Sequence, residues 1–503
     1  MKKIMTLGCG VLCAASALAL MEPATPESQG VSSAAIMKFI DACEKNYDAG
    51  KQGAMHGFVI VRHGKVIAEG SWKPFDTLNE THMLYSHSKS FTSTAIGFLV
   101  YEGKLDLDER VVEIFSNDAP IKVSENLAQL RVRDLLTMNV GKQDHLLRDG
   151  GNWVKEFLSK DFVCRPGTHF QYDSDATYML AAIVELRTGK HLMDYLKEKM
   201  FDKIGIEKAW TTTSPQGIAC GGWGMNMTTR ELARFGQLYL NRGQWEGEQV
   251  LPAEWVDLAT TRHTWSGWQN VGVQALGSGS DWEQGYGFQF WRCTHGAYRA
   301  DGAAGQYTVV LPAEDMVVSM HAGANDFQKE LNLLWDNLLP GLSKTPLKED
   351  AVTYGQLQNR LANLKIVPDK MRQSAELPIA LLGRYEFAPT EHGLKSMEFV
   401  RHGDDTIHCK LFTACGEQEF NAGVWPKWCK GDKIRIDPEH WEKLGGYIGE
   451  HVVAATCCGD QQGRFVFRAY FTADTGYLDI VITPDRKLTG LFWGMGGCHI
   501  KSK

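Results

Sequence analysis

The 503-residue sequence lacks several signatures that would each have fixed a function class. It has no C-x-x-C pair and no H-E-x-x-H, so we expect no metal site, and no organic cofactor is expected either. It has no block of lysine and arginine, and its formal charge of -7 excludes a basic surface for nucleic acid. It has no G-x-S-x-G, which argues against the α/β-hydrolase fold. The expected partner is a small-molecule or peptide substrate.

Long apolar runs are missing beyond the first 20 residues, so no retained membrane span is expected. Residues 1–19 combine a basic start, an apolar run and the small-residue sequence Ala-Leu-Ala, which predicts a secretory signal peptide and an exported protein, periplasmic or secreted. Neither Cys9 nor Cys13 has the context for lipid attachment, so a lipoprotein is not expected. The other ten of the twelve cysteines could form disulfides after export, but the sequence does not assign the pairs.

The length fits two domains. Residues 24–342 read as α+β: a helix at residues 33–48, a hairpin at residues 58–68, a helical middle, three strands and a final helix. This order predicts an antiparallel sheet whose strands come from both ends of the domain and which helices flank. The three late strands are expected at residues 286–291, 307–312 and 316–320.

A turn-rich stretch and a connecting helix make residues 343–376 a predicted linker. Residues 377–503 then contain seven or eight short apolar runs separated by polar turns, which predicts an all-β domain, either a lipocalin-like barrel or a sandwich. This domain either covers or shapes the cleft of the first domain, or binds an extended ligand, or serves only to stabilise the protein.

The stretch "YSHSKSF", residues 85–91, places three serines, a histidine and a lysine at the start of a predicted helix. On a helix, residues three apart share a face, whereas neighbours diverge by about 100°. Ser86 is therefore placed to meet Lys89, and His87 is not. A neutral lysine can accept the proton of a serine hydroxyl, and a helix N-terminus in a cleft favours that neutral form.

Several stretches resemble the penicillin-recognising serine hydrolases, which include class C β-lactamases, DD-peptidases and related esterases. The stretch "SHSKSFTSTAIGFLV" is similar to their nucleophile helix. The stretch "RPGTHFQYDSDATYML" is similar to their second motif, with Tyr172 conserved in type and Ser174 in place of the usual asparagine. That serine, together with residues 221–256, looks like the branch that contains 6-aminohexanoate-dimer hydrolase and carboxylesterases. The likeness covers about residues 24–340 and implies a β-lactamase-like domain.

The resemblance implies a role for each matching residue. Ser86 would be the acylated nucleophile and Lys89 its proton acceptor. Tyr172, as a phenolate or as a relay with Lys89, would carry protons to the leaving group and activate the deacylating water. Ser174 would hydrogen-bond Lys89 or the substrate, and a simple turn role for this serine stays open.

The family's third motif is a strand with K-T-G or H-x-G, and here the matching residues are Ala300, Asp301 and Gly302. Gly302 would let the substrate lie against the strand, and the NH of Ala303 would join the NH of Ser86 in an oxyanion hole. The cation that helps to bind a substrate carboxylate is missing, which favours an esterase or amidase over a β-lactamase. The neighbouring Arg299 could take the place of this cation, but it is interpreted as a solvated strand residue.

Aromatic residues supply further candidates for substrate binding, chiefly Trp223 and Tyr286, although a core position is an equal interpretation for both. Trp153, Trp265 and Trp268 are weaker candidates for the pocket mouth, and His82 and His145 are expected to be structural. Two enzymatic alternatives remain, a D-amino-acid peptidase and a weak β-lactamase. A third alternative is a ligand-binding or cell-wall-binding protein that keeps the fold without catalysis.

Overall fold

The computed structural model describes residues 20–48, 54–142, 151–266, 279–390, 393–435, 450–493 and 498–503. The predicted signal peptide, residues 1–19, lies outside these ranges. Within them, no helix combines the length and the apolar character that crossing a membrane requires. The ten cysteines at described positions carry free thiols, so the disulfides that export would permit do not occur among them.

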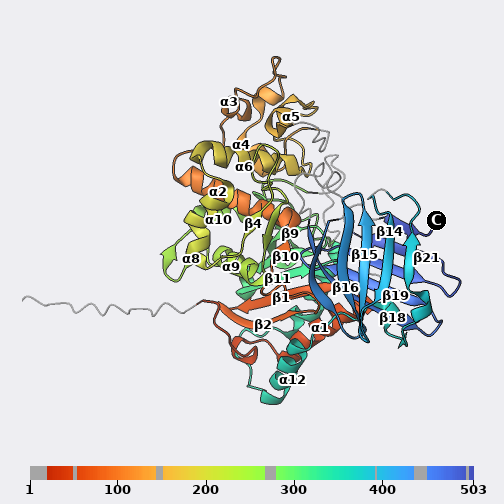
Figure 1. Ribbon diagram of the computed structural model, residues 1–503. Coiled ribbons are helices and arrows are strands. Elements are labelled where there is room, and N and C mark those ends of the chain that lie inside the picture. The colour runs from red at the N-terminus through yellow and green to blue at the C-terminus, as the bar shows by residue number, and fades with distance from the viewer. Residues whose placement is uncertain are drawn as a thin grey trace, which may run out of the picture.

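An antiparallel sheet of six strands forms the centre of the first domain, in the order β2-β1-β11-β10-β9-β8 (Figure 1). Strands from both ends of the domain therefore lie side by side, as the sequence predicts. The bounds are β1 Met55–Arg62, β2 Lys65–Ser71, β8 Trp291–Arg292, β9 Tyr298–Gly302, β10 Gln306–Leu311 and β11 Met316–Ala322.

Both faces of this sheet are covered, because every residue of the central strands β1 and β11 is buried. Alternate side chains of a strand point to opposite faces. Phe58 and Ile60 accordingly join the core beneath α1, α11 and α12, whereas Val59 and Val61 join the core beneath α2 and α9. Helix α2, which carries the catalytic candidate Lys89, thus packs on a sheet that is covered on both faces.

Helices fill the rest of the first domain and the linker. The predicted helix at residues 33–48 has those bounds, and Thr228 and Glu231 form a capping box at the start of α9. The bounds are α1 Ser33–Asp48, α2 Ser88–Tyr101, α3 Val111–Ile114, α4 Val132–Leu136, α5 Trp153–Ser159, α6 Ser174–Thr188, α7 Leu192–Leu196, α8 Asp202–Ile204, α9 Thr229–Leu240, α10 Ala253–Thr260, α11 Phe327–Asn337 and α12 Ala351–Ala362. Short strands β3 His82–Met83, β4 Trp210–Thr211 and β5 Met225–Met227 form a small sheet, and β6 Gln244–Trp245 pairs with β7 Glu248–Gln249.

The strand predicted at residues 286–291 is wrong, since only Trp291 belongs to a strand. The backbone before it bonds to loops and to the end of α10: the NH of Tyr286 donates to Thr264 (3.0 Å) and that of Phe288 to Ala259 (2.9 Å). A Cβ at Gly287 would lie 2.1 Å from the Ala259 carbonyl oxygen. Close contact with α10 therefore replaces the sheet pairing that the apolar pattern favours.

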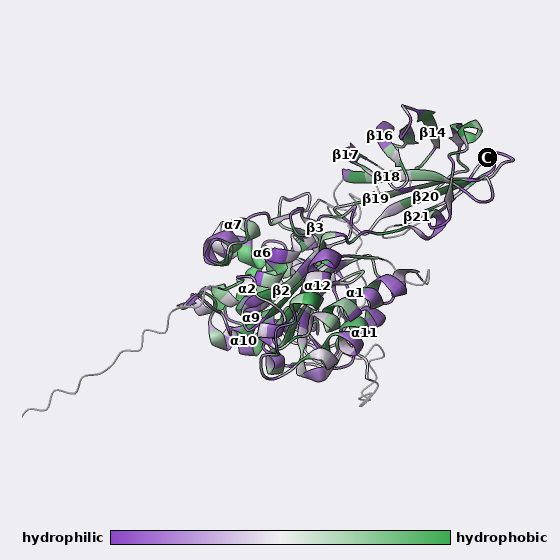
Figure 2. Ribbon diagram, turned by 90° about the horizontal axis from the view of Figure 1, so that it is seen from below, coloured by the Kyte–Doolittle hydropathy of each residue, from purple (hydrophilic) through white to green (hydrophobic). Residues whose placement is uncertain are grey.

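The second domain is one curled sheet of eleven strands, which agrees with the all-β prediction. Its main path is β13-β14-β15-β16-β18-β19-β20-β21-β22, and a bridge from Phe387 to Ser502 joins the two ends. Figure 2 shows these strands as a lobe beside the first domain. The bounds are β12 Ser374–Ala375, β13 Gly383–Glu386, β14 Ser396–Arg401, β15 Thr406–Thr413, β16 Gly416–Val424, β17 Cys429–Ile434, β18 His451–Asp460, β19 Phe465–Phe471, β20 Tyr477–Ile482, β21 Leu488–Trp493 and β22 Cys498–Lys501.

Candidate active site

The three serines of "YSHSKSF" have different surroundings. Ser86 belongs to a single 3-10 turn, Tyr85–His87, that leads directly into α2, and it lines a cavity. Ser88 and Ser90 are buried, and their hydroxyls donate to the backbone carbonyls of Tyr85 and Gln289, both at 2.7 Å. Of these three serines, Ser86 is the one whose hydroxyl is placed to meet a ligand.

The Lys89 amine lies beside the Ser86 hydroxyl and is buried. Its Nζ is 2.8 Å from Ser86 Oγ, 3.0 Å from Ser174 Oγ and 2.6 Å from the Gly222 carbonyl oxygen. These three contacts, all to oxygen atoms, fix the position of the amine beside the Ser86 hydroxyl. The S-x-x-K spacing thus brings the amine to the serine as helical geometry requires. The Gly222 acceptor was not foreseen, because any residue type can supply a carbonyl oxygen.

Tyr172 completes the group around Ser86. Lys89 Nζ lies 4.8 Å from the centre of the Tyr172 ring, and the Tyr172 side chain hydrogen-bonds Ser86. Burial raises the pKa of Tyr172 well above its ordinary value of 10, and the bond to Ser86 opposes that rise only in part. Tyr172 is therefore a neutral phenol near pH 7, which favours the relay interpretation over the phenolate.

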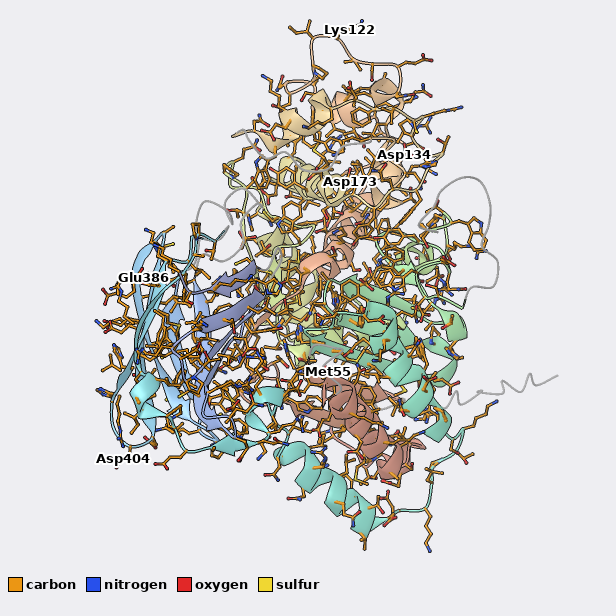
Figure 3. The ribbon with its side chains drawn as sticks, turned by 90° about the vertical axis from the view of Figure 1, so that its right-hand side faces the viewer. Met55, Lys122, Asp134, Asp173, Glu386 and Asp404 are labelled. Carbon is orange, nitrogen blue, oxygen red and sulfur yellow. The ribbon has the colours of Figure 1, made fainter. Side chains whose placement is uncertain are left out.

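Ser174 is the first residue of α6, where Asp173 caps the helix by accepting from the NH of Asp175 at 2.9 Å. Lys142 pairs with both carboxylates, at 3.3 Å from Asp173 and 3.0 Å from Asp175. Figure 3 labels Asp173 in the helical part of the domain. The helix start is thus rigidly held, and Ser174 Oγ accepts from Lys89 while belonging to that turn.

The end of β9 closely approaches the turn Tyr85–His87, which carries Ser86. A Cβ at Gly302 would lie 2.0 Å from the Leu84 carbonyl oxygen and 3.2 Å from the His87 nitrogen. Glycine at this position therefore lets the strand pack against the turn that carries Ser86. The next residue, Ala303, lines the same cavity as Ser86, which places both residues of the predicted oxyanion hole at one opening.

The interpretation of Arg299 as a solvated strand residue is wrong. Its side chain is fully buried, its Nε donates to Asp301 at 2.6 Å, and it lies 4.4 Å from the centre of the Trp282 ring. Burial raises the pKa of Asp301 to about 6, and the Arg299 charge opposes that rise. Arg299 thus neutralises the Asp301 carboxylate in the cavity wall. Because its guanidinium group is bound to Asp301, it is not available to bind a substrate carboxylate.

The cavity beside Ser86 has a volume of about 970 Å³. Two of its aromatic walls, Trp282 and Trp291, were not among the predicted candidates. Its described lining contains no lysine or arginine. The lining residues are Ser86, His169, Phe170, Gln171, Tyr172, Ser266, Trp282, Trp291, Asp301, Ala303, Asn325, Asp326, Phe327 and Gln328.

Trp223 and Tyr286, predicted to bind substrate, stand outside that lining and are buried in the core. Tyr286 lies edge-on to Tyr172, with ring centres 6.2 Å apart, and Trp223 stacks on Tyr178 at 6.5 Å. Tyr286 thus packs behind the cavity wall, whereas Trp223 packs against core residues that do not line the cavity. Trp153 is buried too, Trp265 is exposed, and Trp268 and His145 lie outside the described residues.

His87 is fully buried and packs on Phe91, with ring centres 5.8 Å apart. Burial lowers the pKa of His87 to about 3, so this imidazole is neutral at every pH near 7. His82 is also buried and bonds the Met83 carbonyl oxygen at 3.0 Å. Neither histidine is among the cavity-lining residues.

Known proteins are similar to this chain in sequence and in fold. The beta-lactamase family model matches residues 40–341. The 6-aminohexanoate-dimer hydrolase of Paenarthrobacter ureafaciens is 26% identical over 331 residues, which is 61% of this chain and 82% of that protein. The D-aminopeptidase of Brucella anthropi is 25% identical over 189 residues, 35% of each chain. A solved Bacillus anthracis protein, provisionally named a 6-aminohexanoate-dimer hydrolase, superposes with a TM-score of 0.50 at 23% identity, over 63% of this chain and 86% of its own.

Proposed function

Since the chain belongs to the beta-lactamase family, a family of serine hydrolases, we propose that it hydrolyses a carboxylic ester or amide through an acyl-enzyme on Ser86. The observation that carries this proposal is the position of Ser86 Oγ, which faces the cavity at 2.8 Å from Lys89 Nζ and is hydrogen-bonded to Tyr172. A serine becomes nucleophilic when a neighbouring group takes its proton. The N-terminal 19 residues support export as a further part of the proposal.

In the acylation step, Ser86 Oγ bonds to the substrate carbonyl carbon while its proton passes to the pair formed by the Tyr172 hydroxyl and the Lys89 amine, which enters this step as a neutral amine. The pair then returns a proton to the leaving oxygen or nitrogen as that bond breaks. In deacylation a water molecule takes the place of the serine, with the same pair accepting its proton and returning one to Ser86. The backbone NH groups of Ser86 and Ala303 would hold the negative oxygen of each intermediate.

The charge of the cavity supports a substrate without a carboxylate near the reacting bond. Asp326 lines it, Arg299 neutralises the Asp301 carboxylate, and no lysine or arginine lines it among the described residues. A substrate carboxylate would find no cation in this lining and would be repelled by Asp326, because like charges in a partly desolvated site interact strongly. We therefore propose esterase or amidase activity in preference to hydrolysis of β-lactams.

A substrate with a free amine near the reacting bond is the second candidate, and it includes amides of D-amino acids. The Asp326 carboxylate of the wall would accept such an amine, and one relative is named a D-aminopeptidase. A binding protein without catalysis is less well supported, because a ligand site alone needs no amine and phenol around one hydroxyl.

The test is the time course of p-nitrophenol release from an activated ester. We expect a burst followed by turnover in the natural protein, and neither phase in Ser86→Ala. The matched control is Ser93→Ala, which removes a buried hydroxyl of the same helix that bonds Phe288 at 2.7 Å. A burst that persists in Ser86→Ala would place the nucleophile at another residue, and reversible binding without a burst would favour the binding protein.

A further inference from the structure

The second domain contacts residues 82–85, which lead directly into Ser86. Its loop between β19 and β20, residues 472–476, lies against residues 82–85. The Met83 NH donates to the Ala473 carbonyl oxygen at 2.9 Å, and the Asp474 carbonyl oxygen lies 3.1 Å from His82 Nε2. The cavity lining consists of residues from 86 to 328, so this loop acts on the turn without forming a wall of the cavity.

Tyr85, the residue directly before Ser86, takes part in this contact through its side chain. Its φ angle is +50°, in the left-handed region that bulky residues rarely occupy. Such a conformation persists only when its surroundings hold it. The Tyr85 hydroxyl donates to the Asp474 carboxylate and lies 3.0 Å from Thr475 Oγ1.

The Asp474 carboxylate is itself fixed before it meets Tyr85. The Asp474 NH donates to the Phe471 carbonyl oxygen at 2.9 Å, and Oδ1 accepts from the Thr475 NH at 2.6 Å. Asp474 is 5% exposed and Tyr85 is 3% exposed, so water does not compete for their bond. A hydrogen bond to a carboxylate is stronger than one between neutral groups. The loop thus presents a rigid, charged acceptor to a strained residue.

We infer that Asp474 is a positioning residue for catalysis: through Tyr85 it holds the turn that aims Ser86 at the cavity. This inference rests on the proposed role of Ser86. It gives the second domain a part in catalysis without any contact with substrate. Loss of the bond lets Tyr85 relax toward an ordinary φ angle, which moves Ser86 Oγ away from Lys89. The effect falls on acylation and deacylation alike, because the same Ser86, Lys89 and Tyr172 act in both steps, and it leaves the cavity walls in place.

The experiment measures kcat and KM for p-nitrophenyl ester hydrolysis by Tyr85→Phe and Asp474→Ala, together with the thermal midpoint of each variant. We expect kcat to fall by about 10- to 100-fold in each, since small displacements of a reacting group have effects of that size. KM should stay within about twofold, because the walls that bind substrate are unchanged. The double variant should be no slower than either single variant, since both changes remove one bond.

Two further variants separate positioning from general stability. Asp474→Asn keeps an acceptor oxygen and should recover most of the lost kcat. Asp460→Ala removes a similarly buried carboxylate of the same domain, which bonds Arg464 at 2.6 Å, and should leave kcat unchanged whatever its thermal midpoint. Normal kcat in Tyr85→Phe, or equal losses in Asp460→Ala, would overturn the inference. Absence of any covalent labelling at Ser86 in the natural protein would instead overturn the proposed function.

Discussion

At the scale of residues, the chemistry depends on which groups around Ser86 carry protons. Tyr172 is a neutral phenol near pH 7, since burial raises its pKa, and three acceptors surround the Lys89 amine. In the proposed mechanism the serine proton therefore passes to a neutral Lys89 amine, directly or through the Tyr172 hydroxyl.

Replacing Tyr172 by phenylalanine tests the relay. The ring and its contact with Trp291, at 5.6 Å between centres, remain, but the hydroxyl is lost. We expect ester turnover to slow by about 10²- to 10⁴-fold, the usual effect of removing a proton-transfer group. Tyr239→Phe is the control, because it removes a buried hydroxyl that bonds Thr94 at 2.7 Å away from the cavity. Near-normal turnover in Tyr172→Phe would remove this residue from proton transfer.

The residues nearest the nucleophile could be predicted from the sequence because helical spacing and motif order place them. Ser86, Lys89, Tyr172 and Ser174 do come together in the structure. The Gly222 carbonyl could not be predicted, because a backbone acceptor leaves no signature in residue type. The burial of Arg299 was also missed, since a polar strand residue is buried only when a partner such as Asp301 comes with it.

At the scale of elements, the site depends on the close approach of β9 to the turn Tyr85–His87, which carries Ser86. In Gly302→Ala the new Cβ would overlap the Leu84 carbonyl oxygen, at 2.0 Å, so the strand and the turn must move apart. We expect a loss of about 1–3 kcal/mol in unfolding free energy, as for other overpacked sites. Ester turnover should also fall, and by more than the loss of folded protein explains. The reason is that Ala303, whose NH is proposed to bind the negative oxygen, moves with the strand.

Gly355→Ala is the control for that substitution. Gly355 lies within α12, and a Cβ there meets nothing within 4 Å. Alanine should raise the unfolding free energy by about 0.5–1 kcal/mol and leave activity unchanged. Denaturant unfolding and ester turnover, measured on both variants, check the pair. Full activity in Gly302→Ala would show that β9 need not touch the turn.

Elements with a clear apolar period were predicted well, and those without one were not. The helix at residues 33–48 and the hairpin of β1 and β2 follow directly from the pattern. β16 and β17 were missed, because "GEQEFNAGV" and "CKGDKI" contain few apolar residues. Both segments form strands because they pair with the neighbouring strands β15 and β18, although their own sequences do not favour a strand.

At the scale of the whole molecule, buried histidines gather near the junction of the two domains. His56 Nδ1 lies 3.0 Å from His82 Nε2, and the His321 ring lies 4.6 Å from that of His82. Burial lowers the pKa of all three below the ordinary value of 6.5. The folded protein keeps them neutral, whereas the unfolded chain takes up protons below pH 6.5. Their contribution to stability is therefore present above that pH and is lost as the pH falls.

The thermal midpoint should accordingly drop when the pH is lowered from about 7 to 5. Each such histidine lowers the unfolding free energy of the protein by about 1.4 kcal/mol for every pH unit below the pKa that it has in the unfolded chain. His321→Gln removes one titrating group and should make the pH dependence shallower, even if the variant is less stable at pH 7. His402→Gln, at an exposed histidine of the second domain, should keep the full dependence. An unchanged slope in His321→Gln would contradict this account.

The position of the second domain could not be predicted from the sequence. Its strands are readable one by one, but its docking depends on scattered residues such as Tyr470, which packs on Phe75 at 5.4 Å and bonds Tyr47 at 3.1 Å. These residues are far apart in the chain and follow no shared pattern. Tyr85 and Asp474 meet across that same junction.

The most direct test of the central claim is the mass of the protein after reaction with a fluorophosphonate, followed by peptide mapping of the adduct. We predict one adduct per chain, located on Ser86, and no adduct in Ser86→Ala. An adduct on any other residue, or an unmodified protein that still hydrolyses the ester, would contradict the assignment of Ser86 as the nucleophile.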